Sequence, residues 1–319
     1  MREKIILLLI LFPTLVFSQV NKIFRQANRT TDLNEKISLL TQVIDLEPKN
    51  LDAYFFRAIA KNDLGDYLGA IVDYSKIIVE EPDADTYYNR GNSRYSLKDF
   101  TGAKQDYAKA FMLDENFTDA LYSLGCVKYD LGEYQDAIKD FSNVLKVAPN
   151  ESKVYTLRAN AYKALEDFQN ALEDYNTAIL IEQTIDSYYS RGLFFIDIKY
   201  YKEAIRDFTI VLRADKNNAY AYFYRGASNL FLGKFLDAIS DFSKALEFDA
   251  MDFDAYLGLA MSYNKVNDVV NAKANFEKAN SIIAPNESIS SIEQYRNTFW
   301  FINQYFYFNN SINELIKLK

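Results

Sequence analysis

The sequence of 319 residues contains no histidine, a single cysteine and a single tryptophan, and only 10 glycines and 5 prolines. The absence of histidine excludes Ser-His-Asp and Cys-His catalysis and histidine-containing zinc sites. Cys126 alone can close no intrachain disulfide and build no cluster of thiolate ligands. Because glycine and proline mark turns, their scarcity predicts few turns and mostly helical structure. We expect no metal, no cofactor and no enzymatic activity.

The chain also lacks an excess of basic residues. It has 36 Lys and Arg against 44 Asp and Glu, a formal net charge of −8. A phosphate backbone would be repelled by this balance, so nucleic acid is not an expected partner. Hydrophobic residues make up 49% and charged residues 25%, which is typical of a folded protein. The abundant residues are aromatic, with 25 Tyr and 24 Phe.

The first eighteen residues have the layout of a secretory signal peptide. A short basic-leaning head is followed by an apolar run from Ile5 to Phe17, and Val16 and Ser18 fit the positions before a cleavage site. The apolar run is too short to span a bilayer comfortably. We therefore predict a cleaved signal peptide over residues 1–18 and an exported protein, periplasmic or secreted. The alternatives are a retained membrane anchor and a buried N-terminal helix.

An alanine recurs along most of the chain at steps of 33 or 34 residues. An aromatic residue follows each alanine after four positions, and a small or β-branched residue follows after seven. These spacings place the residues on one face of a helix. The alanine–aromatic pairs are Ala70/Tyr74, Ala103/Tyr107, Ala137/Phe141, Ala171/Tyr175, Ala204/Phe208, Ala238/Phe242 and Ala272/Phe276.

A second stripe precedes each alanine and joins a large residue to a small one four positions later. Its members are Tyr54/Ala58, Tyr87/Gly91, Leu121/Gly125, Tyr155/Ala159, Tyr188/Gly192, Tyr222/Gly226 and Tyr256/Ala260. Turns such as Leu64–Asp66 separate the stripes, and their glycine can supply the left-handed conformation that ends a helix. Each unit is therefore predicted to be a helical hairpin, which must stack on its neighbours to bury its faces.

This 34-residue hairpin resembles the tetratricopeptide-repeat (TPR) family. The resemblance covers seven units, at 51–83, 84–117, 118–151, 152–184, 185–218, 219–252 and 253–285. A degenerate unit at 19–50 is predicted to form an N-terminal cap, and 286–319 is predicted to be a capping region with one more amphipathic helix. The resemblance implies an all-α, right-handed α-solenoid and a non-enzymatic scaffold that binds a protein or peptide in its concave groove.

The C-terminal region carries more aromatic residues than one helix face can bury, at 299–301 and 305–308. Besides capping the solenoid, these residues could contact a partner or a membrane surface. Membrane contact is expected only there or through the N-terminal segment.

Arginine and aspartate recur in step with the repeat. Five units carry both residues, as Arg57/Asp73, Arg90/Asp106, Arg158/Asp174, Arg191/Asp207 and Arg225/Asp241. Counting favours pairs within a unit, because pairing across units would leave two aspartates without an arginine rather than one, Asp140. We interpret the pairs as partly buried, structural ion pairs that fix helix register. The functional alternative is a ladder of arginines that binds an acidic ligand.

Family geometry, if it applies, places the first helix of each unit on the concave side. The candidate partner-binding residues on that side are Phe55, Tyr88, Asn92, Tyr95, Tyr122, Tyr129, Tyr189 and Phe223. Tyrosine offers large contact area and a polar tip, which suits protein recognition. An acidic edge at Asp52, Asp85, Asp119, Asp186 and Asp254 would favour a neutral or basic partner. The alternative is that these rings only pack on one another.

Three functions follow from these patterns. An exported interaction scaffold accounts for most of them. A membrane-tethered envelope assembly factor would retain the signal as an anchor. A carboxylate-based hydrolase is a remote third, because the acidic residues recur with the repeat period, as structural positions do.

Overall fold

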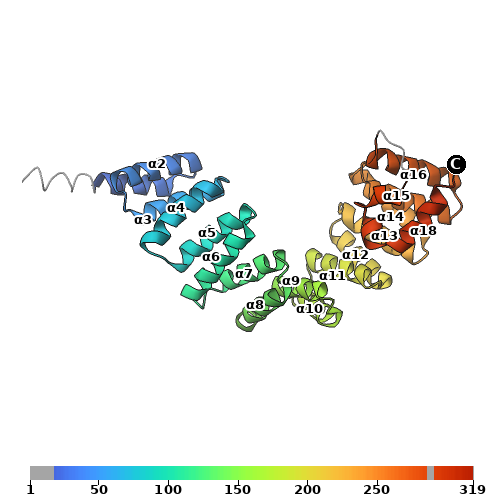
Figure 1. Cartoon of the computed structure of the whole chain (residues 1–319), viewed down its shortest axis with the longest axis horizontal. Coiled ribbons are helices and arrows are strands. Elements are labelled where there is room, and N and C mark those ends of the chain that lie inside the picture. Colours follow the sequence, from blue (N-terminus) through green and yellow to red (C-terminus); the bar gives the residue numbers. More distant parts are fainter. Residues whose placement is uncertain (1–17, 286–290, 319) are drawn as a thin grey trace, which may run out of the picture. The chain divides into compact units, whose positions relative to one another are not determined.

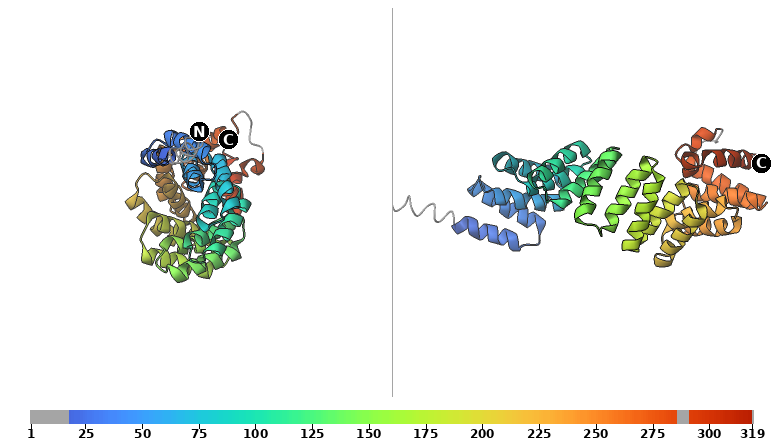
Figure 2. Two further views of the ribbon diagram at one scale, coloured as in Figure 1. Left: turned by 90° about the vertical axis from the view of Figure 1, so that its left-hand side faces the viewer. Right: turned by 90° about the horizontal axis from the view of Figure 1, so that it is seen from below.

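A computed structural model describes residues 18–285 and 291–318, and these residues form helices and turns without any β-strand (Figure 1). Most of the predicted signal peptide lies outside the described residues. Successive helices alternate as the first and second members of hairpins (Figures 1 and 2). The predicted all-α solenoid of stacked helical hairpins is thereby confirmed.

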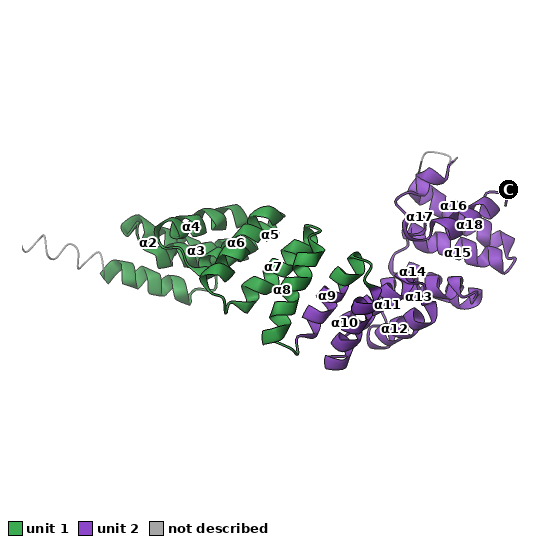
Figure 3. Ribbon diagram, turned by 60° about the horizontal axis from the view of Figure 1, so that its bottom comes forward, with its two compact units in different colours: residues 1–150, 160–167 green, residues 151–159, 168–319 purple. Residues whose placement is uncertain are grey.

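The chain divides into two compact units (Figure 3). Unit 1 comprises the described residues up to 150 together with 160–167, and unit 2 comprises 151–159 and 168–319. The helix α9 (Ser152–Ala164) contributes residues to both. After a helix at 18–29, the helices of unit 1 are α2 (Leu33–Leu46), α3 (Leu51–Asp63), α4 (Tyr67–Glu80), α5 (Ala84–Ser96), α6 (Phe100–Leu113), α7 (Thr118–Asp130) and α8 (Tyr134–Val147).

Unit 2 continues the same alternation and ends in three short helical elements. Its helices are α10 (Phe168–Ile181), α11 (Ile185–Asp197), α12 (Tyr201–Ala214), α13 (Ala219–Phe231), α14 (Phe235–Phe248), α15 (Phe253–Lys265), α16 (Val269–Ile283), the 3₁₀ helix η1 (Ile292–Tyr295), α17 (Phe299–Asn303) and α18 (Tyr305–Leu315). The single C-terminal helix expected from the sequence is therefore divided into η1, α17 and α18.

Helix ends follow local chemistry that repeats with the units. The Asp66 and Asp99 carboxylates each accept a backbone N–H three residues later at 2.9 Å, which begins the second helix. Gly65, Gly132 and Gly233 have positive φ and end first helices as predicted. The same turn recurs at Lys98, Glu166, Lys199 and Asn267, with φ between 60° and 63°. A side chain is therefore tolerated in the left-handed turn where the hairpin fixes its geometry.

The core of each hairpin is built from the two predicted stripes. The alanines that open the second-helix motif are fully buried, as are the rings of Phe141, Phe208 and Phe242. Small residues on the first helix make room for these rings, because a Cβ added at Gly125 would lie 2.7 Å from the Phe141 ring. The alternation of small and aromatic residues is thus a packing requirement of the hairpin.

Among the described residues, none of the helices combines the length and the apolar character needed to cross a membrane.

Candidate partner-binding surface

The structure brings together the five arginine–aspartate pairs, each within its own repeat of 33 or 34 residues. In each pair the guanidinium Nε and Nη2 donate to the two carboxylate oxygens, at distances between 2.6 and 3.0 Å. The aspartate side chains are only 2–7% exposed and the arginines 13–22%. Each pair joins the first helix of a hairpin to the second, which fixes their register.

The aspartates of these pairs are buried more deeply than the partly buried pairs expected from the sequence. As whole residues, Asp73 is 1% exposed, and Asp106 and Asp207 are each 2% exposed. The reason is their position, since each directly precedes the second-helix aromatic residue that fills the hairpin core, and the arginine of the first helix covers the carboxylate. These carboxylates therefore belong to the core and offer no surface to a partner.

The arginines also make contacts that the sequence pattern did not reveal. In four pairs the remaining Nη1 donates to the second helix of the preceding repeat; the acceptors are Thr41, Ser75, Asn176 and Thr209. Each of the five guanidinium groups also lies 5.4–5.7 Å from the centre of a tyrosine ring three residues earlier. Through these hydrogen bonds the arginines link the two helices of a hairpin and, in four repeats, the hairpin to the preceding repeat.

Asp140 pairs with a residue that sequence reasoning missed. Its carboxylate accepts from Lys128 at 2.6 Å, and burial raises the pKa of Asp140 despite that cation. Lys61 and Arg94 occupy the equivalent place in their repeats and also pair with the aspartate. The sequence did contain a signal for this contact, because these three repeats carry a Lys or Arg four residues after the position that is Arg in most repeats.

In unit 1, five of the residues predicted to face the concave side are grouped under the name tyrosine wall: Tyr88, Asn92, Tyr95, Tyr122 and Tyr129. The side chains come from α5 and α7, and all five are half-buried or, for Tyr95, 36% exposed. Tyr88 packs against Tyr107, and Tyr129 packs against Tyr134. The wall therefore combines apolar ring faces with polar tips at a solvent boundary.

Polar contacts hold the tips of the tyrosine wall. The Tyr95 hydroxyl donates to Asp130 of the next first helix, and the Tyr107 hydroxyl donates to Asn92 at 2.8 Å. Burial and the neighbouring Asp130 carboxylate raise the pKa of Tyr95 to about 12. Burial also raises the pKa of Tyr122, and Cys126, Tyr95 and Tyr88 add to that effect. Tyr95 and Tyr122 are therefore neutral at physiological pH.

Two other predicted residues lie in similar ring contacts. The half-buried Phe55 ring lies 5.9 Å from Tyr74 in an edge-on arrangement. The half-buried Tyr189 ring lies 5.8 Å from Phe208 and 6.2 Å from Tyr224. An aromatic inner position packed on the second-helix aromatic therefore recurs in both units.

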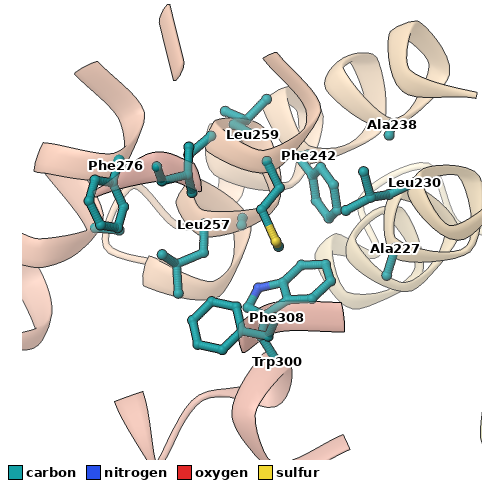
Figure 4. Packing of buried hydrophobic residues seen from close by; sticks show 14 of the residues in the cluster. Ala227, Leu230, Ala238, Phe242, Leu257, Leu259, Phe276, Trp300 and Phe308 are labelled. Atoms are coloured by element: carbon teal, nitrogen blue, oxygen red, sulfur yellow. The ribbon is translucent and has the colours of Figure 1, made fainter. Parts of the chain in front are cut away.

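Phe223, also expected to line an open groove, lies under the chain's own C-terminal segment, residues 291–318. It is 5% exposed, and its ring lies 5.2 Å from Phe299 and 5.9 Å from Trp300. The inner wall of the last two repeats is apolar, and Trp300 and Phe308 pack against it beside Phe242 and Leu257 (Figure 4). The structure differs here from an inner wall that is open throughout, because apolar side chains on α13 and α15 are buried by this cover.

The cover is tied to the start of α15 by hydrogen bonds. The Asp254 carboxylate accepts the backbone N–H of Phe299 at 3.0 and 3.1 Å, and its backbone carbonyl accepts from the Trp300 indole at 2.8 Å. Burial raises the pKa of Asp254 to about 7, and the N–H donors only partly offset this. Asp254, expected at an acidic edge, is thus a docking point for the C-terminal segment.

Within residues 18–285 and 291–318, no group of three or more His, Cys, Asp or Glu side chains is arranged to hold a metal ion.

Comparisons with known proteins agree with this repeat architecture. Family models described as tetratricopeptide repeat match residues 84–117 and 152–184, residues 118–151, and residues 200–252. A comparison of the sequence with curated proteins found no significant match.

Solved structures of similar fold include a tetratricopeptide repeat protein from Parabacteroides merdae, 18% identical, with 77% of this chain and 100% of that chain covered and a TM-score of 0.61. A chain of the APC/C hetero-tetramer Cut9–Hcn1 is 17% identical over 88% of this chain and 54% of that chain, with a TM-score of 0.55. MamA protein is 21% identical over 54% of this chain and 95% of that chain, with a TM-score of 0.50.

The present chain spans about half the length of the Cut9–Hcn1 chain that it matches. At these identities the likeness establishes the fold alone. The periodic core, the hairpin geometry and the matching family models lead to one conclusion: the chain belongs to the tetratricopeptide-repeat family.

Proposed function

We propose that this protein is a non-enzymatic interaction scaffold that binds a segment of another protein on the tyrosine wall of unit 1. The observation that carries the proposal is the character of that wall. Its rings are partly exposed and carry hydroxyls, while the inner wall of the last two repeats is apolar and covered. Half-exposed tyrosines offer ring area and hydrogen bonds at low entropic cost, which suits reversible recognition of a protein.

Site-specific photo-crosslinking tests the proposal. A benzoylphenylalanine placed at Tyr95 should crosslink to a defined protein that mass spectrometry identifies. The same group at Val79, 78% exposed on the second helix α4, provides the matched control and should not capture it. Adding Tyr88→Ala and Tyr122→Ala should reduce the crosslink from position 95. Equal capture from both positions, or capture that ignores the two alanines, would refute binding on the tyrosine wall.

The proposal includes export, which rests on the signal-like pattern of residues 1–18. The mass of the mature N-terminus separates a cleaved signal from a retained anchor. An N-terminus beginning at Gln19 supports an exported scaffold, whereas an intact Met1 in a membrane fraction supports the membrane-tethered assembly factor.

A further inference from the structure

The C-terminal segment shows how an inner wall of this protein binds a peptide. Trp300 inserts against two rings that already touch one another, Phe223 and Phe242, at 5.9 Å from each. The backbone N–H of Phe299, in the first turn of α17, donates to Asp254. The segment therefore packs an aromatic side chain against the two rings, and a hydrogen bond from a peptide N–H to a carboxylate fixes its position along the wall.

The residues that receive the C-terminal segment, a pair of rings and a carboxylate, have counterparts at the start of unit 1. Phe55 and Tyr74 form the ring pair, at 5.9 Å compared with 5.7 Å for Phe223 and Phe242. Asp85 is the second residue of α5, just as Asp254 is the second residue of α15. Even the helix caps agree, because Asp83 accepts from the N–H of Thr86 as Asp252 does from that of Ala255.

The two sites differ in exposure and in charge. Asp85 is exposed and Phe55 is half-buried, and Tyr74, 1% exposed, packs behind the Phe55 ring. Asp254 and Phe223, by contrast, lie under the C-terminal segment. Trp300 also touches Phe231, whose place in the first repeat is taken by the exposed Asp63. Asp63 lies close enough to raise the pKa of Tyr74 further. The first site is therefore a ring pair rimmed by carboxylates, which suits a basic residue beside the aromatic one.

We infer that the N-terminal docking site, formed by Phe55 on the buried Tyr74 together with Asp83 and Asp85, binds a segment of a partner protein in the pose of residues 298–301. The segment presents an aromatic side chain to the partly exposed Phe55 ring, a peptide N–H to Asp85 and a neighbouring Lys or Arg to the acidic rim. This inference rests on the proposed scaffold function and extends the binding surface from the tyrosine wall to α3 and the start of α5.

A peptide of residues 294–305 is the probe, because it contains Thr298, Trp300 and the basic Arg296. Labelled with a fluorophore, it is titrated into the full chain and followed by fluorescence anisotropy. We expect saturable binding that weakens about tenfold in Asp85→Ala, the loss of one charge-assisted hydrogen bond. Asp136→Ala, in the exposed first turn of the second helix α8, is the matched control and should leave the affinity unchanged. A peptide carrying Trp300→Ala should not bind.

A photoreactive residue in place of Phe301 of the peptide locates the bound state. Crosslinks within α3 to α5 support the inference. Crosslinks within α13 to α15 mean that the peptide has exchanged with the chain's own segment, and they overturn it. Absence of binding, or equal binding by Asp85→Ala, also overturns it. A dimer that the peptide dissociates would identify a second copy as the occupant instead.

The scaffold proposal is tested separately, by the crosslink from position 95. If the peptide does not bind while that crosslink persists, only the docking pose is wrong. If both fail, the inner surface of unit 1 is not a binding surface.

Discussion

The inner walls of the two units are built on the same hairpins but meet solvent differently. In unit 1 the inner positions of α5 and α7 are tyrosines and an asparagine, and they stay partly exposed. In the last two repeats the corresponding positions include Phe223, Leu230 and Leu257, all buried under Trp300 and its neighbours. An apolar wall requires a permanent cover, whereas a wall of tyrosines can remain exposed without one. The difference separates a surface that closes the fold from one suited to reversible binding.

Removing the cover should have the largest effect. Trp300→Ala deletes a fully buried ring that touches α13 and α14, so we expect the free energy of unfolding of unit 2 to fall by about 3–5 kcal/mol. Hydrogen exchange should show the loss in unit 2 while unit 1 keeps its protection. Phe306→Ala, 84% exposed in the same segment, is the control and should change little. Equal stability of the two variants would mean that the segment does not seal the wall.

Both units contain the buried arginine–aspartate pairs, and breaking one should have the second-largest effect on stability. Arg158→Ala leaves Asp174 buried without its guanidinium partner, and we expect a loss of about 3 kcal/mol. Chemical denaturation measures it, and Lys244→Ala, from an exposed pair with Glu247, is the control and should change the stability far less. Photo-crosslinking of the partner protein from position 95 should be unaffected by Arg158→Ala. Unchanged melting combined with lost binding would return the arginines to the role of a ligand ladder.

The covered wall should also respond to pH. The pKa of Asp254 rises from 3.8 to about 7 on folding, so the folded chain holds a proton that the unfolded chain has released. The contribution of Asp254 to stability should therefore be fully present below about pH 4, decline as the pH rises through 7 and then level off. We expect roughly 2 kcal/mol, since the half-buried side chain is partly screened.

Denaturation at pH 5 and pH 8 measures this change. In Asp254→Asn the difference between the two pH values should shrink, with a remainder from Asp252, whose pKa burial also raises. A stability that increases with pH, or a slope that the substitution leaves intact, would show that Asp254 does not lie in the sealed contact.

A substitution in the tyrosine wall should have the smallest effect on stability. Tyr95→Phe removes the hydroxyl that donates to Asp130, which should cost about 1 kcal/mol because solvent can replace that bond. Tyr200→Phe, at a tyrosine 55% exposed, is the reference in the same thermal melts. A loss several times larger would place Tyr95 in a sealed core like that of the last repeats, and the contrast between the walls would disappear.

Periodic features were readable from the sequence, since each is reinforced by five to seven copies. The hairpins, the small–aromatic core and the Arg–Asp partners follow from spacing alone. The role of Lys128 was missed because only three repeats place a cation there. The covering of Phe223 could not be predicted either, because Asp254 and Phe299 are 45 residues apart and the C-terminal segment has no periodic counterpart. Its three short helices depend on the surface against which they pack.

Trp300 is the chain's single tryptophan, so its fluorescence reports on the sealed wall alone. With the ring fully buried against Phe223 and Phe242, the native protein should emit at short wavelength and resist quenching by acrylamide. Emission should shift to the red only when unit 2 unfolds. A native chain whose tryptophan is red-shifted and freely quenched would contradict the account, because the last two repeats would then have an open inner wall too.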